Sequence, residues 1–228
     1  MDSKLLVNQA ALLNAEGSHA LTLGDAMAAH YKLKQALQVL SQATDSCIQQ
    51  APVIKEEGWY RSIVSSAVVP GLNETSQGGD FYVCNNALLF HFLDEDVIDS
   101  AAVAICCHCV MFNMALTLHQ RGMLTGTERN FVSAGRLYEQ CLRLSAEIEG
   151  SVDDLNIMAI AIWNNLAQLH YMLGDYDMAI ENLKTVQGFV SDTDLEECVS
   201  PGLAHAVKLD NVILNVLVTS RPTTAPCA

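Results

Sequence analysis

The pattern of hydrophobic and polar residues is most regular between Ala161 and Val186, where it has the spacing of α-helices. Gly174-Asp175-Tyr176 interrupts this pattern near its centre and predicts a turn between two helices. Small residues on both sides of the turn let the helices approach closely, while larger residues fill the space around them. The positions that carry the pattern are Trp163, Leu166, Ala167, Ala179 and Leu183.

Two earlier stretches repeat part of this pattern. Counted back from Gly17, Gly122 and Gly174, an asparagine occurs nine residues earlier and an alanine seven residues earlier each time. We interpret the three glycines as helix ends. The second helices of the three hairpins then align with one another only if the first two turns, at 18–25 and 123–130, are seven residues longer than the third. The recurrence predicts three similar helical hairpins. The repeated residues are Asn8, Asn113 and Asn165, followed by Ala10, Ala115 and Ala167.

The window 161–186 resembles one tetratricopeptide repeat, a helix-turn-helix unit whose pattern places Trp, Leu and small residues at these separations. The resemblance covers 156–188 and extends to 100–145 and 5–42. It implies an all-α solenoid in a single domain, 1–220, that binds protein partners. The parts expected are a first hairpin at 1–49, a second at 98–147, a third at 152–190, a capping helix at 200–218 and a flexible tail at 221–228.

The stretch 50–97 differs from the repeats because it is rich in proline and glycine. Two segments rich in β-branched or aromatic residues, 62–69 and 81–92, flank a loop at 70–80. This arrangement predicts an inserted β-hairpin between the first and second helical hairpins. A lone hairpin is marginally stable in water, so we expect it to pack on the helices, and the concave groove of the solenoid is one place for it.

The charge of the chain restricts the classes of partner that we expect, and its cysteines indicate a cellular compartment. With 26 acidic and 12 basic residues the net charge is −14, which repels phosphate backbones and anionic lipid and argues against nucleic-acid binding. Eight cysteines in a chain of this length, without an apolar signal segment at the start, favour reduced buried thiols and a cytoplasmic protein. An apolar run at 101–118 is long enough to span a membrane, but polar residues interrupt it and we expect a buried helix instead.

No motif in the chain predicts catalysis, and we expect no cofactor. Cys106-Cys107-His108-Cys109 contains metal-binding residue types, yet consecutive residues on a helix point about 100° apart and do not converge on one ion. We therefore expect packing rather than a metal site. The acidic clusters each precede a predicted helix, where they complement the helix dipole.

The recurrent asparagines are the best candidates for a binding site. The resemblance implies that an asparagine at this place lies on the inner face of the first helix and can hydrogen-bond the main chain of an extended ligand. The alternative is a buried hydrogen bond between helices that fixes their packing. By helical spacing the same surface includes further residues, so the candidate partner-binding set is Asn8, Phe112, Asn113, Leu116, His119, Asn164, Asn165 and Gln168.

These observations predict a non-catalytic protein-interaction module, a scaffold or adaptor. The basic side chains with which some tetratricopeptide proteins hold acidic chaperone tails are missing from the inner helices, so we expect a neutral or basic protein or peptide partner. The first alternative is an obligate subunit or a self-dimer, because the chain is apolar for a solenoid. An enzyme is the third hypothesis, after the interaction module and the subunit. We also expect loss of Asn113 and Asn165 to weaken partner capture more than folding.

Overall fold

The computed structural model describes residues 2–48, 63–68, 84–90, 98, 100–147, 153–192 and 212. This part of the chain is mostly helical, in agreement with the predicted all-α class. The helices are α1 Ser3–Thr22, α2 Ala26–Ile48, α3 Ser100–Thr125, α4 Glu128–Glu147, α5 Asp153–Met172 and α6 Tyr176–Asp192.

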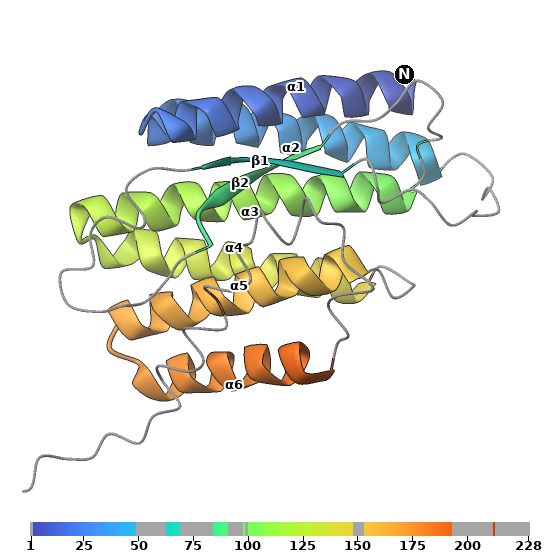
Figure 1. Cartoon of the computed structure of the whole chain (residues 1–228). Coiled ribbons are helices and arrows are strands. Elements are labelled where there is room, and N and C mark those ends of the chain that lie inside the picture. Colours follow the sequence, from blue (N-terminus) through green and yellow to red (C-terminus); the bar gives the residue numbers. More distant parts are fainter. Residues whose placement is uncertain are drawn as a thin grey trace, which may run out of the picture.

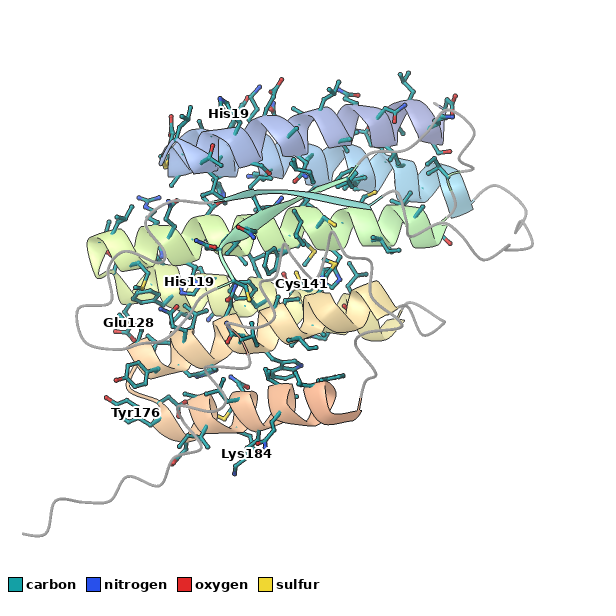
Figure 2. The ribbon with its side chains drawn as sticks, viewed as in Figure 1. His19, His119, Glu128, Cys141, Tyr176 and Lys184 are labelled. Atoms are coloured by element: carbon teal, nitrogen blue, oxygen red, sulfur yellow. The ribbon has the colours of Figure 1, made fainter. Side chains whose placement is uncertain are left out.

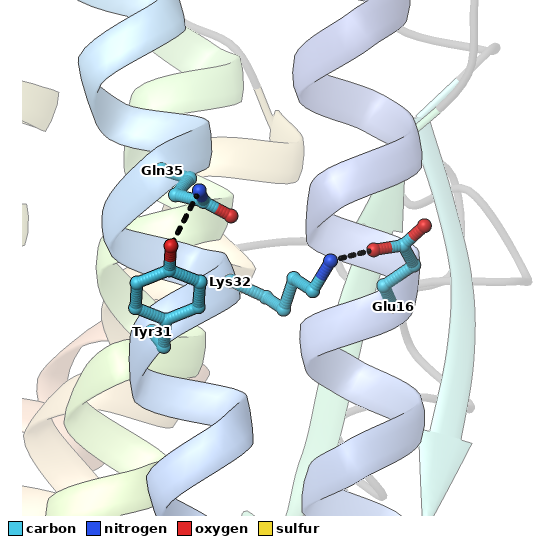
Figure 3. A network of polar contacts seen from close by, with 4 residues as sticks. All are labelled: Glu16, Tyr31, Lys32 and Gln35. Atoms are coloured by element: carbon cyan, nitrogen blue, oxygen red, sulfur yellow. Dashed lines mark hydrogen bonds and ion pairs between the residues drawn. The ribbon is translucent and has the colours of Figure 1, made fainter.

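The helices stack in the order in which they occur along the chain. Each helix packs against the next one, from α1 on α2 through to α5 on α6, and α1 also reaches α3. Figure 1 shows the helices lying side by side, with the turns of all three helix pairs at the same edge of the molecule. A surface ion pair between Lys32 Nζ of α2 and Glu16 Oε2 of α1, 2.6 Å apart, links the first pair (Figure 3). Because both side chains are exposed, this pair contributes little to stability.

The two helices of the first pair and the two helices of the third pair are each joined by a turn of the same three residues. Leu23-Gly24-Asp25 and Leu173-Gly174-Asp175 both contain a glycine with positive φ, 78° and 79° respectively. In each turn the aspartate accepts a hydrogen bond from a main-chain N–H of the following helix, Ala28 N at 3.0 Å and Met178 N at 3.3 Å. A left-handed glycine after one helix and an aspartate cap before the next explain why the chain reverses here.

The interpretation of Gly17 and Gly122 as helix ends is wrong. Both lie inside helices, α1 continues to Thr22, and α3 continues to the turn at Gly126. A methyl group on Gly17 would lie 2.7 Å from Leu33 Cγ, and one on Gly122 would lie 2.6 Å from the Phe131 ring. These glycines are therefore contact points between paired helices, and the lengthened turns at 18–25 and 123–130 do not exist.

With this correction the three helix pairs share one spacing. A small residue of the first helix precedes a buried alanine of the second helix by twelve residues in every pair. Small residues at facing positions let the two helices approach closely, and one large side chain then fills the space beside them. The three pairs of positions are Gly17 with Ala29, Gly122 with Ala134, and Ala167 with Ala179.

Two strands lie across the helices between α2 and α3 in the chain. Strand β1, Ile63–Val68, pairs antiparallel with β2, Asn86–Phe90, with a register irregularity between Ile63 and Ser65. Strand β2 packs on α1 and α3, as Figure 1 shows. The predicted loop at 70–80 lies outside the described residues.

Helix α3 forms the centre of the core. Its stretch Ala102–Thr125 is long and apolar enough to cross a membrane, but most of it is buried among the other helices. The buried side chains include Cys106, Cys109 and Val110 of the run that suggested a membrane helix. The predicted capping helix and the tail at 221–228 lie outside the described residues, except that Val212 is helical and fully buried in the same core.

Candidate main-chain binding site

An asparagine of α3 holds the main chain of β2. Asn113 is fully buried, and its Oδ1 accepts a hydrogen bond from the Leu88 N–H at 2.7 Å. Its Nδ2 donates to the Leu88 carbonyl oxygen, also at 2.7 Å. One side-chain amide thus satisfies both main-chain groups of one residue, an arrangement that we call a bracket.

A second bracket lies on α5. Asn165 Oδ1 accepts a hydrogen bond from the Cys84 N–H at 2.8 Å, and Asn165 Nδ2 donates to the Cys84 carbonyl at 3.0 Å. Residues four apart in an extended chain direct their main-chain groups toward the same edge, because the direction alternates with each residue. The two brackets therefore form hydrogen bonds with the same edge of the segment Cys84–Leu88.

Helix α1 supplies a third asparagine, but it is Asn14 and not Asn8. Asn14 Nδ2 donates to the Leu88 carbonyl at 2.8 Å, and Asn14 Oδ1 accepts from Asn113 Nδ2 at 2.9 Å. Asn8 is exposed on the surface of α1. Sequence reasoning missed Asn14 because it counted from Gly17 rather than from the true turn glycine, Gly24. Asn14 lies ten residues before Gly24, just as Asn164 lies ten residues before Gly174.

The other predicted site residues are all buried, and Asn164 among them contacts this segment. The Asn164 Nδ2 atom lies 3.7 Å from Cys84 Sγ, and Gln168 Nε2 lies 3.9 Å from Met123 Sδ. The structure thus brings seven of the eight predicted residues into the interior and leaves Asn8 outside. The seven are Phe112, Asn113, Leu116, His119, Asn164, Asn165 and Gln168.

Tyr138 of α4 completes the polar cluster behind the brackets. Its hydroxyl accepts a hydrogen bond from Asn165 Nδ2 at 3.1 Å and lies 3.5 Å from His119 Nδ1. The Phe112 and Tyr138 rings are tilted, with centroids 5.8 Å apart, and the His119 ring packs edge-on against Phe131 and Tyr138. Figure 2 shows His119 and Cys141 among the helices, whereas Tyr176 and Lys184 lie on the outside. Tyr138 was not predicted, because a tyrosine at a core position of a helix has no distinctive signal.

Burial keeps the titratable groups of this interior uncharged at neutral pH. It lowers the pKa of His119 to about 4, against a smaller opposing effect of a hydrogen bond with Gln168. It raises the pKa of the Tyr138 hydroxyl, and it raises the pKa of the Cys141 thiol. His108, whose Nδ1 lies 2.9 Å from Ser145 Oγ, has its pKa lowered to about 4 by burial as well. A neutral interior of this kind supports hydrogen bonding rather than proton transfer at neutral pH.

The described residues contain no group of three or more His, Cys, Asp or Glu side chains that could hold a metal ion. The cysteines of 106–109 are free thiols, and burial raises the pKa of Cys107 to about 11. Thiols with raised pKa values are poor nucleophiles.

Comparison of the chain with protein-family models, with curated proteins and with solved structures finds no match.

Proposed function

We propose that this chain is a non-catalytic protein-interaction module of the tetratricopeptide-like kind, whose inner helices hold an extended polypeptide segment by its main chain. The observation that carries the proposal is the pair of brackets, Asn113 on Leu88 and Asn165 on Cys84. The first helices of the three pairs each supply an asparagine to this surface, which supports a repeated structure with a common inner face. In the structure the segment that the brackets hold is Cys84–Leu88 of the same chain.

Brackets suit a protein-binding surface because they recognise extended conformation rather than a particular side chain. Each bracket gives two hydrogen bonds in a buried place, where hydrogen bonds are stronger than in water. The uncharged state of the buried histidines and thiols supports a binding role over acid–base or nucleophilic chemistry.

The experiment is a selection of displayed random peptides on the immobilised full-length chain, followed by binding measurements in solution. We expect extended peptides to be enriched and to change amide exchange on α3 and α5, which form the inner face. The variant Asn8→Ala is a matched control that should bind the selected peptides as the wild type does, because Asn8 is exposed away from the brackets. Failure to select any peptide, or selected peptides that alter exchange only on the outer surface, would contradict the proposal.

The second candidate function is that of an obligate subunit or a self-dimer, with a cytoplasmic location in either case. It is favoured by large apolar side chains that are exposed at the edge where the three helix turns lie. Met and aromatic residues are enriched in protein interfaces. Sedimentation across a wide concentration range tests the self-dimer, since a monomer at all concentrations excludes it. The exposed side chains at this edge are Leu23, Met27, Tyr31, Leu124, Tyr171, Met172 and Tyr176.

A further inference from the structure

The segment that fills the inner face is an unusual strand. Cys84 to Leu88 and Phe90 are all buried, and two successive asparagines, Asn85 and Asn86, occupy its middle. Asparagine is depleted in β-strands because its side chain competes for main-chain hydrogen bonds. The described sheet has only two strands, and a two-stranded sheet is marginally stable by itself. Hydrogen bonds from side chains of α1, α3 and α5 therefore hold this segment in addition to its pairing with β1.

The helices hold it in a way that another chain can copy. The brackets contact N–H and carbonyl groups, which every residue except proline presents in the same geometry. Ala87 and Leu88 are almost fully buried, and Phe90 is nearly so. An external segment with these features would satisfy the same hydrogen bonds and fill the same space.

We infer that residues 84–90 act as an internal plug, and that an extended segment of a partner protein replaces them on the inner face. The inference rests on the proposed function. The partner segment has a small residue before a leucine and an aromatic residue two positions after that leucine, in the pattern of Ala87, Leu88 and Phe90. The net charge of −14 favours a partner with basic residues on either side of this pattern. A charged residue within the pattern is excluded, because it would be buried without a counter-charge.

Replacement makes binding depend on how often the plug leaves. When only a fraction of molecules has an open inner face, the apparent affinity for an external peptide falls by that fraction. A substitution that weakens the plug but leaves the helices unchanged must therefore tighten binding of the external peptide. Asn113 and Asn165 are unsuitable for this test, since their loss weakens the internal and the external segment alike.

The test uses the full-length chain and a capped, fluorescein-labelled peptide with the sequence of residues 84–90. In Leu88→Ala the plug loses a buried side chain, and we expect the peptide to bind at least tenfold more tightly than to the wild type. Leu12→Ala is the matched control, because Leu12 is an exposed leucine of α1 and its loss should leave the affinity unchanged. A folded Leu88→Ala protein that binds the peptide no better than the wild type overturns the inference.

Amide hydrogen exchange on the wild type tests the same point without any substitution. If the plug leaves, the amides of Cys84 and Leu88 exchange through an opening in which the core amides of α3 and α5 stay protected. Exchange of these two amides only through global unfolding overturns the inference. If exchange shows that the plug leaves and Leu88→Ala still binds no peptide, the proposed function fails together with the inference. Exchange only through global unfolding overturns the inference alone, so the two failures are distinguishable.

Discussion

At the scale of single residues, Gly17 and Gly122 set the distance between paired helices. Each faces a large side chain of the second helix, Leu33 or Phe131, at a distance that leaves no room for a methyl group. Glycine inside a helix costs about 0.5–1 kcal/mol relative to alanine, so its presence here needs the compensation of close packing.

We predict that Gly17→Ala and Gly122→Ala destabilise the protein although alanine is the better helix former. Overpacking costs about 1–3 kcal/mol, which exceeds the gain in helix propensity. The matched control is Gly135→Ala on α4, where the added methyl group would lie 3.9 Å from its nearest neighbours. This control should raise the melting temperature while the other two lower it. Equal effects of all three substitutions on thermal melting would contradict the packing role.

Buried histidines make stability depend on pH. His108 and His119 have pKa values of about 4 in the folded protein, below the ordinary value of 6.5. The unfolded chain therefore binds more protons between pH 6.5 and 4, so stability is lost as the pH falls through this window. Each histidine accounts for about 3 kcal/mol at the acid end.

The check is thermal melting from pH 7.5 to 4.5 for the wild type and for His119→Gln. We expect the variant to lose less stability than the wild type over this range, because one proton-linked difference is removed. His19→Gln, which replaces an exposed histidine of α1, should follow the wild-type curve. A variant whose stability falls as steeply as that of the wild type would show that His119 does not carry the effect.

At the scale of elements, the two brackets join the segment Cys84–Leu88 to α3 and α5, and Asn14 joins it to α1. We predict that Asn113→Ala lowers the free energy of unfolding by about 1–3 kcal/mol for each buried group left without its partner. In a chain of this size this corresponds to about 2–4 °C in melting temperature per kcal/mol. This expectation differs from the one drawn from the sequence, which is that loss of Asn113 weakens partner capture more than folding.

Asn8→Ala is the control for this prediction, because the exposed Asn8 should change stability by less than about 0.5 kcal/mol. Asn113→Asp tests the geometry further, since aspartate keeps the acceptor for the Leu88 N–H but loses the donor for its carbonyl. We expect it to be destabilising as well. An Asn113→Ala protein that melts together with Asn8→Ala would contradict the bracket.

The sequence predicts the helices well, but it predicts the residues at which they end less well. The third pair was found with its turn at Gly174, because a glycine next to an aspartate coincides there with a break in the hydrophobic pattern. Gly17 and Gly122 were mistaken for similar turns, since a glycine that packs against a neighbouring helix and a glycine that ends a helix are the same letter. The tripeptide Leu23-Gly24-Asp25 held the missing signal, as it repeats Leu173-Gly174-Asp175. The sequence offers the groove as one place for the segment 81–92, but it does not predict which residues the helices hold there, because brackets recognise main chain and leave no pattern in the segment that they hold.

At the scale of the whole molecule, the last helix pair of a stack exposes an apolar face unless something covers it. Val212 is fully buried in the common core although it lies twenty residues beyond the end of α6 at Asp192. We predict that deletion of residues 201–228 exposes apolar surface and causes aggregation, and that Val212→Ala lowers the free energy of unfolding by about 1.5–3 kcal/mol. Light scattering and thermal melting of both proteins provide the check. A deletion variant that stays soluble and melts cooperatively would show that this segment has another role.

The path of residues 84–90 across the three helix pairs also has a consequence for how the molecule unfolds. In an ordinary repeat array each unit touches only its neighbours, so the ends can fray while the middle persists. Here hydrogen bonds connect residues 74, 81 and 99 positions apart in the chain, from Asn14 to Leu88, from Cys84 to Asn165 and from Asn113 to Asn14. Such distant contacts form late in folding because closing long loops is slow. These hydrogen bonds couple the unfolding of all three helix pairs, because loss of any one pair removes a hydrogen-bond partner from the rest.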